Sequence, residues 1–331
     1  MAAHRPSLTD RVEALAAGGR VSEAYRLLTA PGAAADPQAL FHLAAWRLAG
    51  HYVRRDLPAA RALFGQAAAL GHRDAAACHA AFLANGTGGD SDWQAALDVL
   101  GRHAARDPAF REDLALIGGM NLSAAGDPAS PVRGQPLSAQ PRAMLFPGLF
   151  SAAECAFLIA RAAPALAPSM VIDPQSGRLT RNPVRTSDGM AFPFAEESPA
   201  IHALNRRIAA ATGTLPAQGE PLQVLRYRPG QEYRPHSDAI LGEPNQRILT
   251  VLVYLNQDYT GGETRFLQTG LGYKGQPGDA LAFCNAGEDG RPDPFAQHAG
   301  LPVTSGEKLI ASRWIRAQPF ALPPPKPLLE V

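Results

Sequence analysis

Residues 222–238 read LQVLRYRPGQEYRPHSD: a short apolar run, then a proline and a glycine, then His236-Ser237-Asp238. The apolar run and the turn residues after it are typical of a strand that ends in a loop. On a strand, residues i and i+2 point to the same face, so the His236 imidazole and the Asp238 carboxylate converge on one point. This stretch therefore supplies two candidate ligands for one metal ion.

His298, in the sequence Gln-His-Ala-Gly, is the candidate third ligand, because a second strand beside the first would bring its imidazole to the same point. Two histidines and one carboxylate on one face leave the rest of an octahedron open, as a non-haem iron(II) oxygenase requires. The pair His72-Arg73-Asp74 has the same spacing but lies in a helical segment. On a helix, positions i and i+2 diverge by about 200°, so that pair cannot chelate a metal.

Lys308 follows His298 by ten residues, within Gly306-Glu307-Lys308. An even separation across a strand and a turn can aim its ammonium into the same cavity as the candidate ligands. A doubly negative oxo-acid that chelates a metal at one end needs a fixed positive charge at the other, and lysine offers a point charge. Taken alone, Lys308 would be read as a solvated lysine at a strand end.

The second half of the chain is expected to form an all-β core with two helices before it. The predicted strands are short apolar or alternating runs bounded by Gly, Pro and Asn, at residues 222–227, 248–255, 280–284 and 309–315. The predicted helices cover residues 151–163, with Ser151 as N-cap, and residues 198–212.

The first half of the chain is expected to be α-helical. Residues 8–107 are rich in Ala, Leu and Arg at helical spacing and nearly lack β-branched runs. A period of 36 residues aligns Gly50 with Gly86 and Asp56 with Asp92. Each unit would be a helical hairpin whose alanines allow close packing and whose glycine permits the turn, so that the units stack into a short solenoid.

These patterns predict a multidomain α + β chain in four parts. The helical repeat domain covers residues 1–117, a linker of small residues and prolines covers 118–141, the β domain covers 142–320 and a proline-rich tail covers 321–331. The segment from Pro319 onward is expected to be extended or disordered.

Composition excludes several function classes. The net charge is +1 and no run of Lys or Arg interleaves with aromatic residues, so we expect neither a nucleic-acid partner nor a membrane surface. The three cysteines, Cys78, Cys155 and Cys284, lack the spacing of a disulfide framework or a zinc cluster. No signal peptide or long apolar segment is visible, so a cytoplasmic location is predicted.

The helical half resembles Sel1-like repeats, which are relatives of the tetratricopeptide family. The resemblance lies in Ala67-Ala68-Ala69-Leu70-Gly71 followed by Asp74-Ala75, which is similar to the repeat junction of that family. It implies a concave surface that could hold a peptide or protein partner. The alternative is a cap that only stabilises the other domain.

Residues 141–320 resemble the prolyl 4-hydroxylases of the 2-oxoglutarate dioxygenase superfamily. The resemblance rests on an ordered series of motifs, which includes Val184-Arg185-Thr186-Ser187, Gly230-Gln231-Glu232-Tyr233, His236-Ser237-Asp238, Tyr254-Leu255-Asn256, Gly261-Gly262-Glu263-Thr264, His298-Ala299-Gly300 and Gly306-Glu307-Lys308. It implies a double-stranded β-helix, or jelly roll, with helices on one outer face and iron held by His236, Asp238 and His298 in its mouth.

The resemblance also implies roles for the residues around the iron. Lys308 would pair with the distal carboxylate of 2-oxoglutarate, Tyr254 would hydrogen-bond that carboxylate, and Tyr227 would face the site beside the iron. The segment Arg185, Thr186 and Ser187 would close over the substrate, and Trp314 would lie near the substrate channel. The sequence departs from the family at Leu309, often aromatic there, and in a long loop at residues 285–295, which leaves the substrate open.

By this resemblance the chain would use Fe²⁺, 2-oxoglutarate and O₂, with ascorbate to rescue oxidised iron, and would release succinate and CO₂ as it hydroxylates a C–H bond. The preferred substrate is a prolyl residue in a peptide or protein, hydroxylated at C4; another residue or a free amino acid is left open. Two rival readings are a non-catalytic scaffold that binds partners through the repeats and a structural or hydrolytic zinc site.

Overall fold

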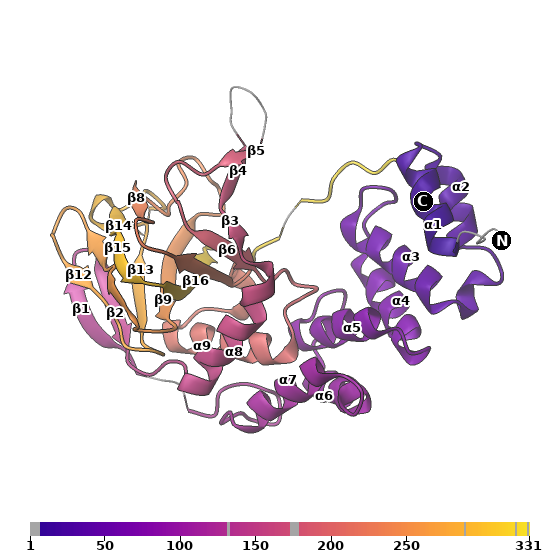
Figure 1. The fold of residues 1–331 in the computed structure, drawn as a ribbon, viewed down its shortest axis with the longest axis horizontal. Helices are drawn as coiled ribbons and strands as arrows, with labels where there is room; N and C mark the ends of the chain where they lie inside the picture. Colours follow the sequence, from indigo (N-terminus) through magenta and orange to yellow (C-terminus); the bar gives the residue numbers. More distant parts are fainter. Residues whose placement is uncertain (1–6, 131–132, 173–178, 288, 322, 330) are drawn as a thin grey trace.

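The computed structural model describes residues 7–130, 133–172, 179–287, 289–321, 323–329 and 331. Figure 1 shows a helical region, which holds the first part of the chain, beside a β-rich region that holds the second. Within the described residues, no helix combines the length and the apolar character needed to cross a membrane.

Seven α-helices lie in the described part of the N-terminal region, which confirms its predicted helical character. Their bounds are α1 (Leu8–Ala17), α2 (Val21–Leu28), α3 (Pro37–Ala49), α4 (Leu57–Ala69), α5 (Arg73–Asn85), α6 (Trp93–Ala104) and α7 (Pro108–Gly118). From α3 to α7, each helix packs against the next in the chain.

The period of 36 residues in the sequence appears in the structure as a period of helix caps. Asp56 and Asp92 are the N-caps of α4 and α6, and each side chain accepts a hydrogen bond from the backbone N–H three residues later. Gly50 and Gly86 end α3 and α5 in the left-handed conformation, at φ of 78° and 76°. The repeated residues therefore set where each helix begins and ends.

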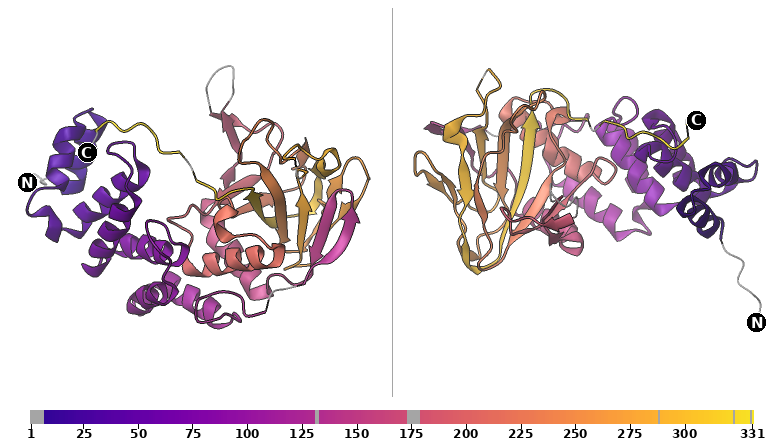
Figure 2. Two further views of the ribbon diagram at one scale, coloured as in Figure 1. Left: turned by 180° about the vertical axis from the view of Figure 1, so that it is seen from behind. Right: turned by 90° about the horizontal axis from the view of Figure 1, so that it is seen from above.

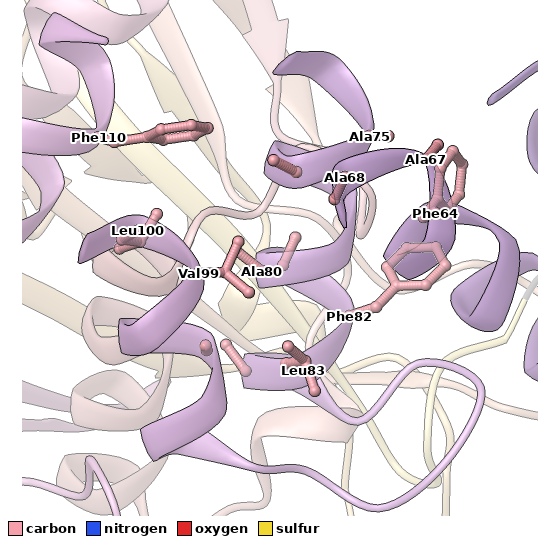
Figure 3. Packing of buried hydrophobic residues seen from close by; sticks show 14 of the residues in the cluster. Phe64, Ala67, Ala68, Ala75, Ala80, Phe82, Leu83, Val99, Leu100 and Phe110 are labelled. Atoms are coloured by element: carbon pink, nitrogen blue, oxygen red, sulfur yellow. The ribbon is translucent and has the colours of Figure 1, made fainter. Parts of the chain in front are cut away.

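Small side chains fill the core of the helical region. Ala60 and Ala67 on α4 and Ala75 and Ala80 on α5 are fully buried in this core, where their small side chains let helix backbones approach closely. Phe64 and Phe82 meet edge to face in the same cluster, with ring centroids 5.6 Å apart. Figure 3 shows these two rings close together, with Ala67 next to Phe64.

The β-rich region contains sixteen described strands and two helices. The strands are β1 (Gln135–Ala139), β2 (Arg142–Phe146), β3 (Ala167–Pro168), β4 (Met170–Ile172), β5 (Leu179–Arg181), β6 (Asp188–Ala191), β7 (Gln223–Tyr227), β8 (Tyr233–His236), β9 (Arg247–Tyr254), β10 (Tyr259–Gly261), β11 (Thr264–Phe266), β12 (Gly272–Tyr273), β13 (Ala280–Cys284), β14 (His298–Gly300), β15 (Val303–Gly306) and β16 (Lys308–Arg316). The helices are α8 (Ala152–Ala162) and α9 (Pro199–Thr212). All four predicted strands and both predicted helices are confirmed, as is the Ser151 N-cap.

The strands form two main antiparallel sheets, consistent with the predicted jelly roll. The larger sheet has the order β1-β2-β13-β9-β16-β7-β6-β3 and the smaller has the order β12-β11-β14-β8. Two further pairs, β10-β15 and β4-β5, complete the region. Helices α8 and α9 lie along one face of the larger sheet (Figures 1 and 2).

The side chains of β16 point alternately to the two faces of the larger sheet. Leu309, Ala311 and Ile315 join the hydrophobic cluster under α8 and α9. The intervening Ile310 joins a second cluster on the opposite face of the same sheet. Period-two patterning therefore gives one strand two buried faces, and every residue of β16 is buried.

Part of the segment predicted as a linker belongs to the sheet instead. Residues 135–139 form β1, which pairs with β2 at the edge of the larger sheet. The strand is mostly exposed and contains Pro136, so it lacks the apolar pattern that marks a buried strand. The wider division into domains stays a prediction.

The C-terminal tail is extended, as predicted, and it lies along the helical region (Figures 1 and 2). The backbone N–H groups of Leu328 and Leu329 donate to the carbonyl oxygens of His51 and Tyr52, both over 2.9 Å. The Leu329 side chain packs on the apolar cluster of α1 to α3. The end of the chain thus contacts its first helices.

Deletion of residues 321–331 should loosen the first helices without unfolding the β region. It removes two backbone hydrogen bonds, the hydrogen bond that Arg47 donates to the Val331 carbonyl oxygen and the apolar contact of Leu329. Together these are worth about 2–4 kcal/mol. Amide hydrogen exchange should then quicken in α2 and α3 and stay unchanged in β9 and β16. The exposed Lys326→Ala is the matched control. Unchanged exchange in α2 and α3 would show that the tail contact contributes no stability.

Candidate active site

The three candidate metal ligands converge. Strands β8 and β14 are neighbours in the smaller sheet, and their register places His298 directly opposite His236. Asp238 follows β8 by two residues, and one ligand atom from each of the three residues lies within 4.8 Å of the others. His236 Nε2 is 3.6 Å from Asp238 Oδ1, and His298 Nε2 is 3.8 Å from Asp238 Oδ2.

The pair at residues 72–74 does not form such a group. His72 is the N-cap of α5, and its Nδ1 accepts a hydrogen bond from the Ala75 N–H. Its Nε2 lies 2.9 Å from Gln38 Oε1. Both ring nitrogens of His72 are therefore used to hold helices together.

Both candidate histidine ligands are oriented by backbone carbonyl groups. His236 Nδ1 lies 2.8 Å from the carbonyl oxygen of Arg234, and His298 Nδ1 lies 2.9 Å from that of Ala296. A proton on each Nδ1 satisfies these contacts and leaves the Nε2 lone pair free for a metal. His236 Nε2 is buried and has no hydrogen-bond partner among the described residues. These atoms fit a resident metal ion.

The charge states of the three side chains also suit a metal. Burial raises the pKa of Asp238, but its contacts with His236, His298 and Thr250 outweigh this and hold the pKa far below its usual range. Burial, reinforced by nearby His236, lowers the pKa of His298 to about 4. At neutral pH the site therefore presents a carboxylate anion and at least one neutral imidazole, the forms that bind metals.

A pocket lies between the two sheets at this point. It is lined from the larger sheet by Leu225, Tyr227, Leu252, Lys308, Ile310, Ser312 and Trp314, and from the smaller sheet and its loops by Tyr233, His236, Asp238, Thr264, His298 and Gly300. Aliphatic residues make up part of its wall, so water contact is restricted around the metal ligands.

Lys308 supplies a buried positive charge in this pocket. Its side chain is 3% exposed, and Nζ donates to the carbonyl oxygen of Gly262 over 2.6 Å. No carboxylate of the described residues lies within 4.0 Å of this nitrogen. Burial, and to a smaller degree Lys274, lowers the Lys308 pKa to about 7. A buried cation without an anion is costly, so the pocket fits a cofactor that brings its own carboxylate.

The two tyrosines predicted at the cofactor lie at different depths. Tyr227 lines the pocket, and burial raises its pKa well above the usual value, so its hydroxyl stays a neutral donor. Tyr254 is fully buried behind the wall, where its hydroxyl contacts Thr264 Oγ1 at 3.1 Å and donates to the Tyr273 carbonyl at 3.2 Å. Thr264 itself lines the pocket. Contact between Tyr254 and the cofactor carboxylate stays a prediction.

The predicted substrate segment lies beside the pocket. The backbone of Arg185 forms an isolated antiparallel β-bridge with that of Tyr233. The Arg185 guanidinium donates a hydrogen bond to Ser169 Oγ over 3.1 Å. Thr186 exchanges hydrogen bonds with the backbone of Glu232. Ser187 is fully buried and contacts Tyr227 and Ser169. Arg185 and Thr186 thus hold the start of β8 and the loop before it, whereas Ser187 packs against β7. Contact of the three residues with a substrate stays a prediction.

Trp314 lines the pocket, as its predicted place near the substrate requires. The Arg247 guanidinium stacks 3.7 Å from the centre of its ring, and Glu220 holds Arg247 by two hydrogen bonds of 2.6 and 2.8 Å. The Trp314 Nε1–H is buried without a partner among the described residues. It is therefore a free donor, and its contact with a substrate stays a prediction.

Three residues of the site were not predicted. Tyr233 stacks on His236 with ring centroids 3.5 Å apart, Thr250 donates to Asp238, and Asn285 donates to Thr250. Thr250 lies two and four residues before Leu252 and Tyr254, so strand alternation could have placed it on the inner face. Asn285 sits in a loop, where no periodic signal exists.

Comparison with known proteins agrees with this geometry. Residues 222–316 match the family model of the 2OG-Fe(II) oxygenase superfamily. Prolyl 4-hydroxylase 1 of Arabidopsis thaliana is 38% identical over 204 residues, which cover 56% of this chain and 72% of the relative. Prolyl 4-hydroxylase 2 of the same plant is 34% identical over 217 residues, which cover 58% and 72%.

Two solved structures are also similar. The viral collagen prolyl hydroxylase of Paramecium Bursaria Chlorella virus-1 is 29% identical with a TM-score of 0.43, and the match covers 53% of this chain and 96% of that one. A Pseudomonas putida prolyl-4-hydroxylase is 19% identical with a TM-score of 0.40, over 53% and 92%.

The matched region and its converging ligands define an iron(II)- and 2-oxoglutarate-dependent oxygenase. Within that class, the chain belongs to the prolyl 4-hydroxylase family. It is therefore a 2-oxoglutarate-dependent dioxygenase whose cofactors are Fe²⁺, 2-oxoglutarate and O₂, with ascorbate as the accompanying reductant. Family membership favours this enzyme over the scaffold and zinc-site readings.

The pKa of Lys308 leads to a test of the cofactor pocket. In the empty site Lys308 loses its proton above about pH 7, whereas the 2-oxoglutarate dianion binds its charged form. Binding then takes up a proton, and the Kd for 2-oxoglutarate should rise about tenfold per pH unit above pH 7 and flatten below it. Anaerobic calorimetry of the iron(II) protein in buffers of different ionisation enthalpy measures both effects.

The matched control for this test is Lys308→Arg. A guanidinium stays charged across the range, so the slope should disappear even if the affinity falls. An equal slope in both proteins would mean that another group takes up the proton.

Proposed function

We propose that the enzyme hydroxylates C4 of a prolyl residue in a peptide or protein and releases succinate and CO₂. The observation that carries the proposal is the convergence of His236, Asp238 and His298 in a pocket that also holds the buried Lys308, which has no carboxylate partner among the described residues. The assignment to proline is supported by relatives whose names state prolyl 4-hydroxylase activity.

The residues of this chain divide the work of that reaction. His236 Nε2, His298 Nε2 and a carboxylate oxygen of Asp238 would hold the iron. Bound iron and 2-oxoglutarate together supply an oxidant able to hydroxylate an unactivated C–H bond. Lys308 would bind the far carboxylate of the cofactor and fix its direction. The apolar side chains of Leu225, Leu252 and Ile310 line the pocket and exclude water from the reacting groups.

Substrate contacts are proposed for the open side of the pocket. Trp314 lines the pocket with an indole N–H that has no partner among the described residues, and Arg185 and Thr186 position the start of β8, which carries Tyr233. Ser187 lies next to Thr186 and would contact the substrate as part of the same segment. The same chemistry on another residue or on a free amino acid is the alternative, because these contacts would also accept other side chains.

For the helical region, we propose a short Sel1-like solenoid that offers a surface to a protein or peptide partner. The regular spacing of the caps at Gly50, Asp56, Gly86 and Asp92 supports the repeat. The alternative, a cap that only stabilises the enzyme, is supported by the packing of α5 and α7 on α9. Pull-down with residues 1–118 deleted distinguishes the two, since a partner bound through the repeats would be lost.

We also propose a cytoplasmic location. All three cysteines are free thiols, which suits a reducing compartment. Fractionation of cells that express the tagged full chain tests this.

The function is tested by anaerobic addition of iron(II) and then 2-oxoglutarate to the purified protein. A weak visible metal-to-ligand band should appear, and after oxygen is admitted, mass spectrometry should find one added oxygen on proline-containing peptides. A band without any modified proline peptide would retain the oxygenase and move the search to other substrates. Iron binding without the band would sink the 2-oxoglutarate site.

Substitution of the residues that bind the metal or the cofactor should change catalysis and leave the fold intact. His236→Ala and Asp238→Ala should abolish turnover while circular dichroism stays unchanged, because each leaves the metal with two protein ligands. Lys308→Ala should chiefly raise the 2-oxoglutarate concentration needed for half-maximal rate. His72→Ala, in the helical region, is the control with the same His-x-Asp spacing and should keep full turnover. Wild-type rates in all three site variants would refute the assignment.

A further inference from the structure

Behind Asp238 lies a buried chain of hydrogen bonds that none of the roles above includes. Thr250 Oγ1 lies 2.6 Å from Asp238 Oδ2, and Asn285 Nδ2 lies 2.8 Å from Thr250 Oγ1. All three side chains are buried, with exposed fractions of 4% for Asp238, 1% for Thr250 and 0% for Asn285. Neither Thr250 nor Asn285 lines the pocket, so both would act through Asp238.

The direction of each hydrogen bond follows from chemistry. The Thr250 hydroxyl is the donor in its contact with Asp238, and the carboxylate oxygen Oδ2 is the acceptor. The Thr250 oxygen is then left as an acceptor, and the Asn285 amide N–H donates to it. Asn285 thereby fixes the hydroxyl proton toward Asp238. Thr250 holds the carboxylate oxygen Oδ2, which lies nearest His298 Nε2, while Oδ1 lies nearest His236 Nε2.

Asn285 also connects to the loop that leads to the third ligand. Its backbone carbonyl accepts from the Asp293 N–H over 2.9 Å, and Asp293 caps the short turn Pro294–Ala296 by accepting from the Phe295 N–H. The carbonyl of Ala296, at the end of that turn, is the group that orients His298. The long loop at which the sequence departs from its family is therefore tied at both ends to metal ligands.

We propose that Thr250 and Asn285 are positioning residues for the metal centre, which hold the Asp238 carboxylate in its ligating orientation and tie it to the turn that orients His298. The inference rests on the metal centre of the proposed function and is independent of the identity of the substrate. Groups that orient metal ligands are worth about 10–100-fold in metal affinity.

The test is the affinity of the full chain for Mn²⁺, measured by equilibrium dialysis without 2-oxoglutarate or substrate. Thr250→Val keeps the shape of the side chain but loses the hydroxyl, and its Kd should rise by about 10–100-fold. Thr250→Ser keeps the hydroxyl and should stay within about threefold of the wild type. Thr212→Val, on α9 and away from the pocket, is the matched control and should bind as the wild type does.

A second variant keeps the test decisive if Thr250→Val does not fold. Asn285→Asp preserves size but places a second carboxylate beside the Thr250 hydroxyl, which can then donate to only one of them. Its Mn²⁺ affinity should fall, and the visible spectrum of the Co²⁺-loaded protein should change because the Asp238 ligand is no longer fixed. Wild-type affinity in Asn285→Asp or Thr250→Val would overturn the proposal. Equal loss in Thr250→Ser and Thr250→Val would also overturn it, since packing rather than the hydroxyl would then be responsible.

Discussion

The pairing of His298 with His236 in the β8–β14 ladder is the constraint on which the site depends. Because side chains alternate along a strand, a slip of one residue would turn one imidazole out of the pocket. The same pairing brings together two residues that are far apart in the sequence, and Asp238 follows from its position two residues after His236. A metal centre built on a ladder in this way inherits the rigidity of the sheet.

The larger sheet meets two opposing demands. One face of β9 and β16 packs under α8 and α9 and is apolar apart from the buried Arg313, while the other carries Lys308, Ser312 and Trp314 toward the pocket. The buried Lys308 ammonium on that inner face has no carboxylate partner within the described part of the chain, so it opposes stability until an anion binds. The protein tolerates this because the strand is anchored on its other face by Leu309, Ala311 and Ile315. Binding of the cofactor carboxylate would relieve this unfavourable burial, and the free energy gained would add to the affinity for the cofactor.

The features that the sequence made predictable are those with a short period. Apolar or alternating runs predict the strands at residues 223–227, 247–254, 280–284 and 308–316. The separation of two residues between His236 and Asp238 predicts that they share one face of a strand and can hold one metal. What could not be predicted depends on contacts between distant segments. Asn285 meets Thr250 only because β13 lies beside β9, and the polar edge strand β1 has no apolar pattern to mark it. No local sequence pattern predicts that Leu329 packs against the first helices.

Helix α9 has two apolar faces, and this links the two halves of the molecule. Ile201, Leu204 and Ile208 pack toward the larger sheet, whereas Ala200 and Ala203 join the core of the helical region. The boundary between the regions is therefore a shared layer rather than a hinge. In evolution, the helical region could be exchanged for another only together with the small residues on this side of α9. A catalytic half inherited alone would need polar substitutions there to remain soluble.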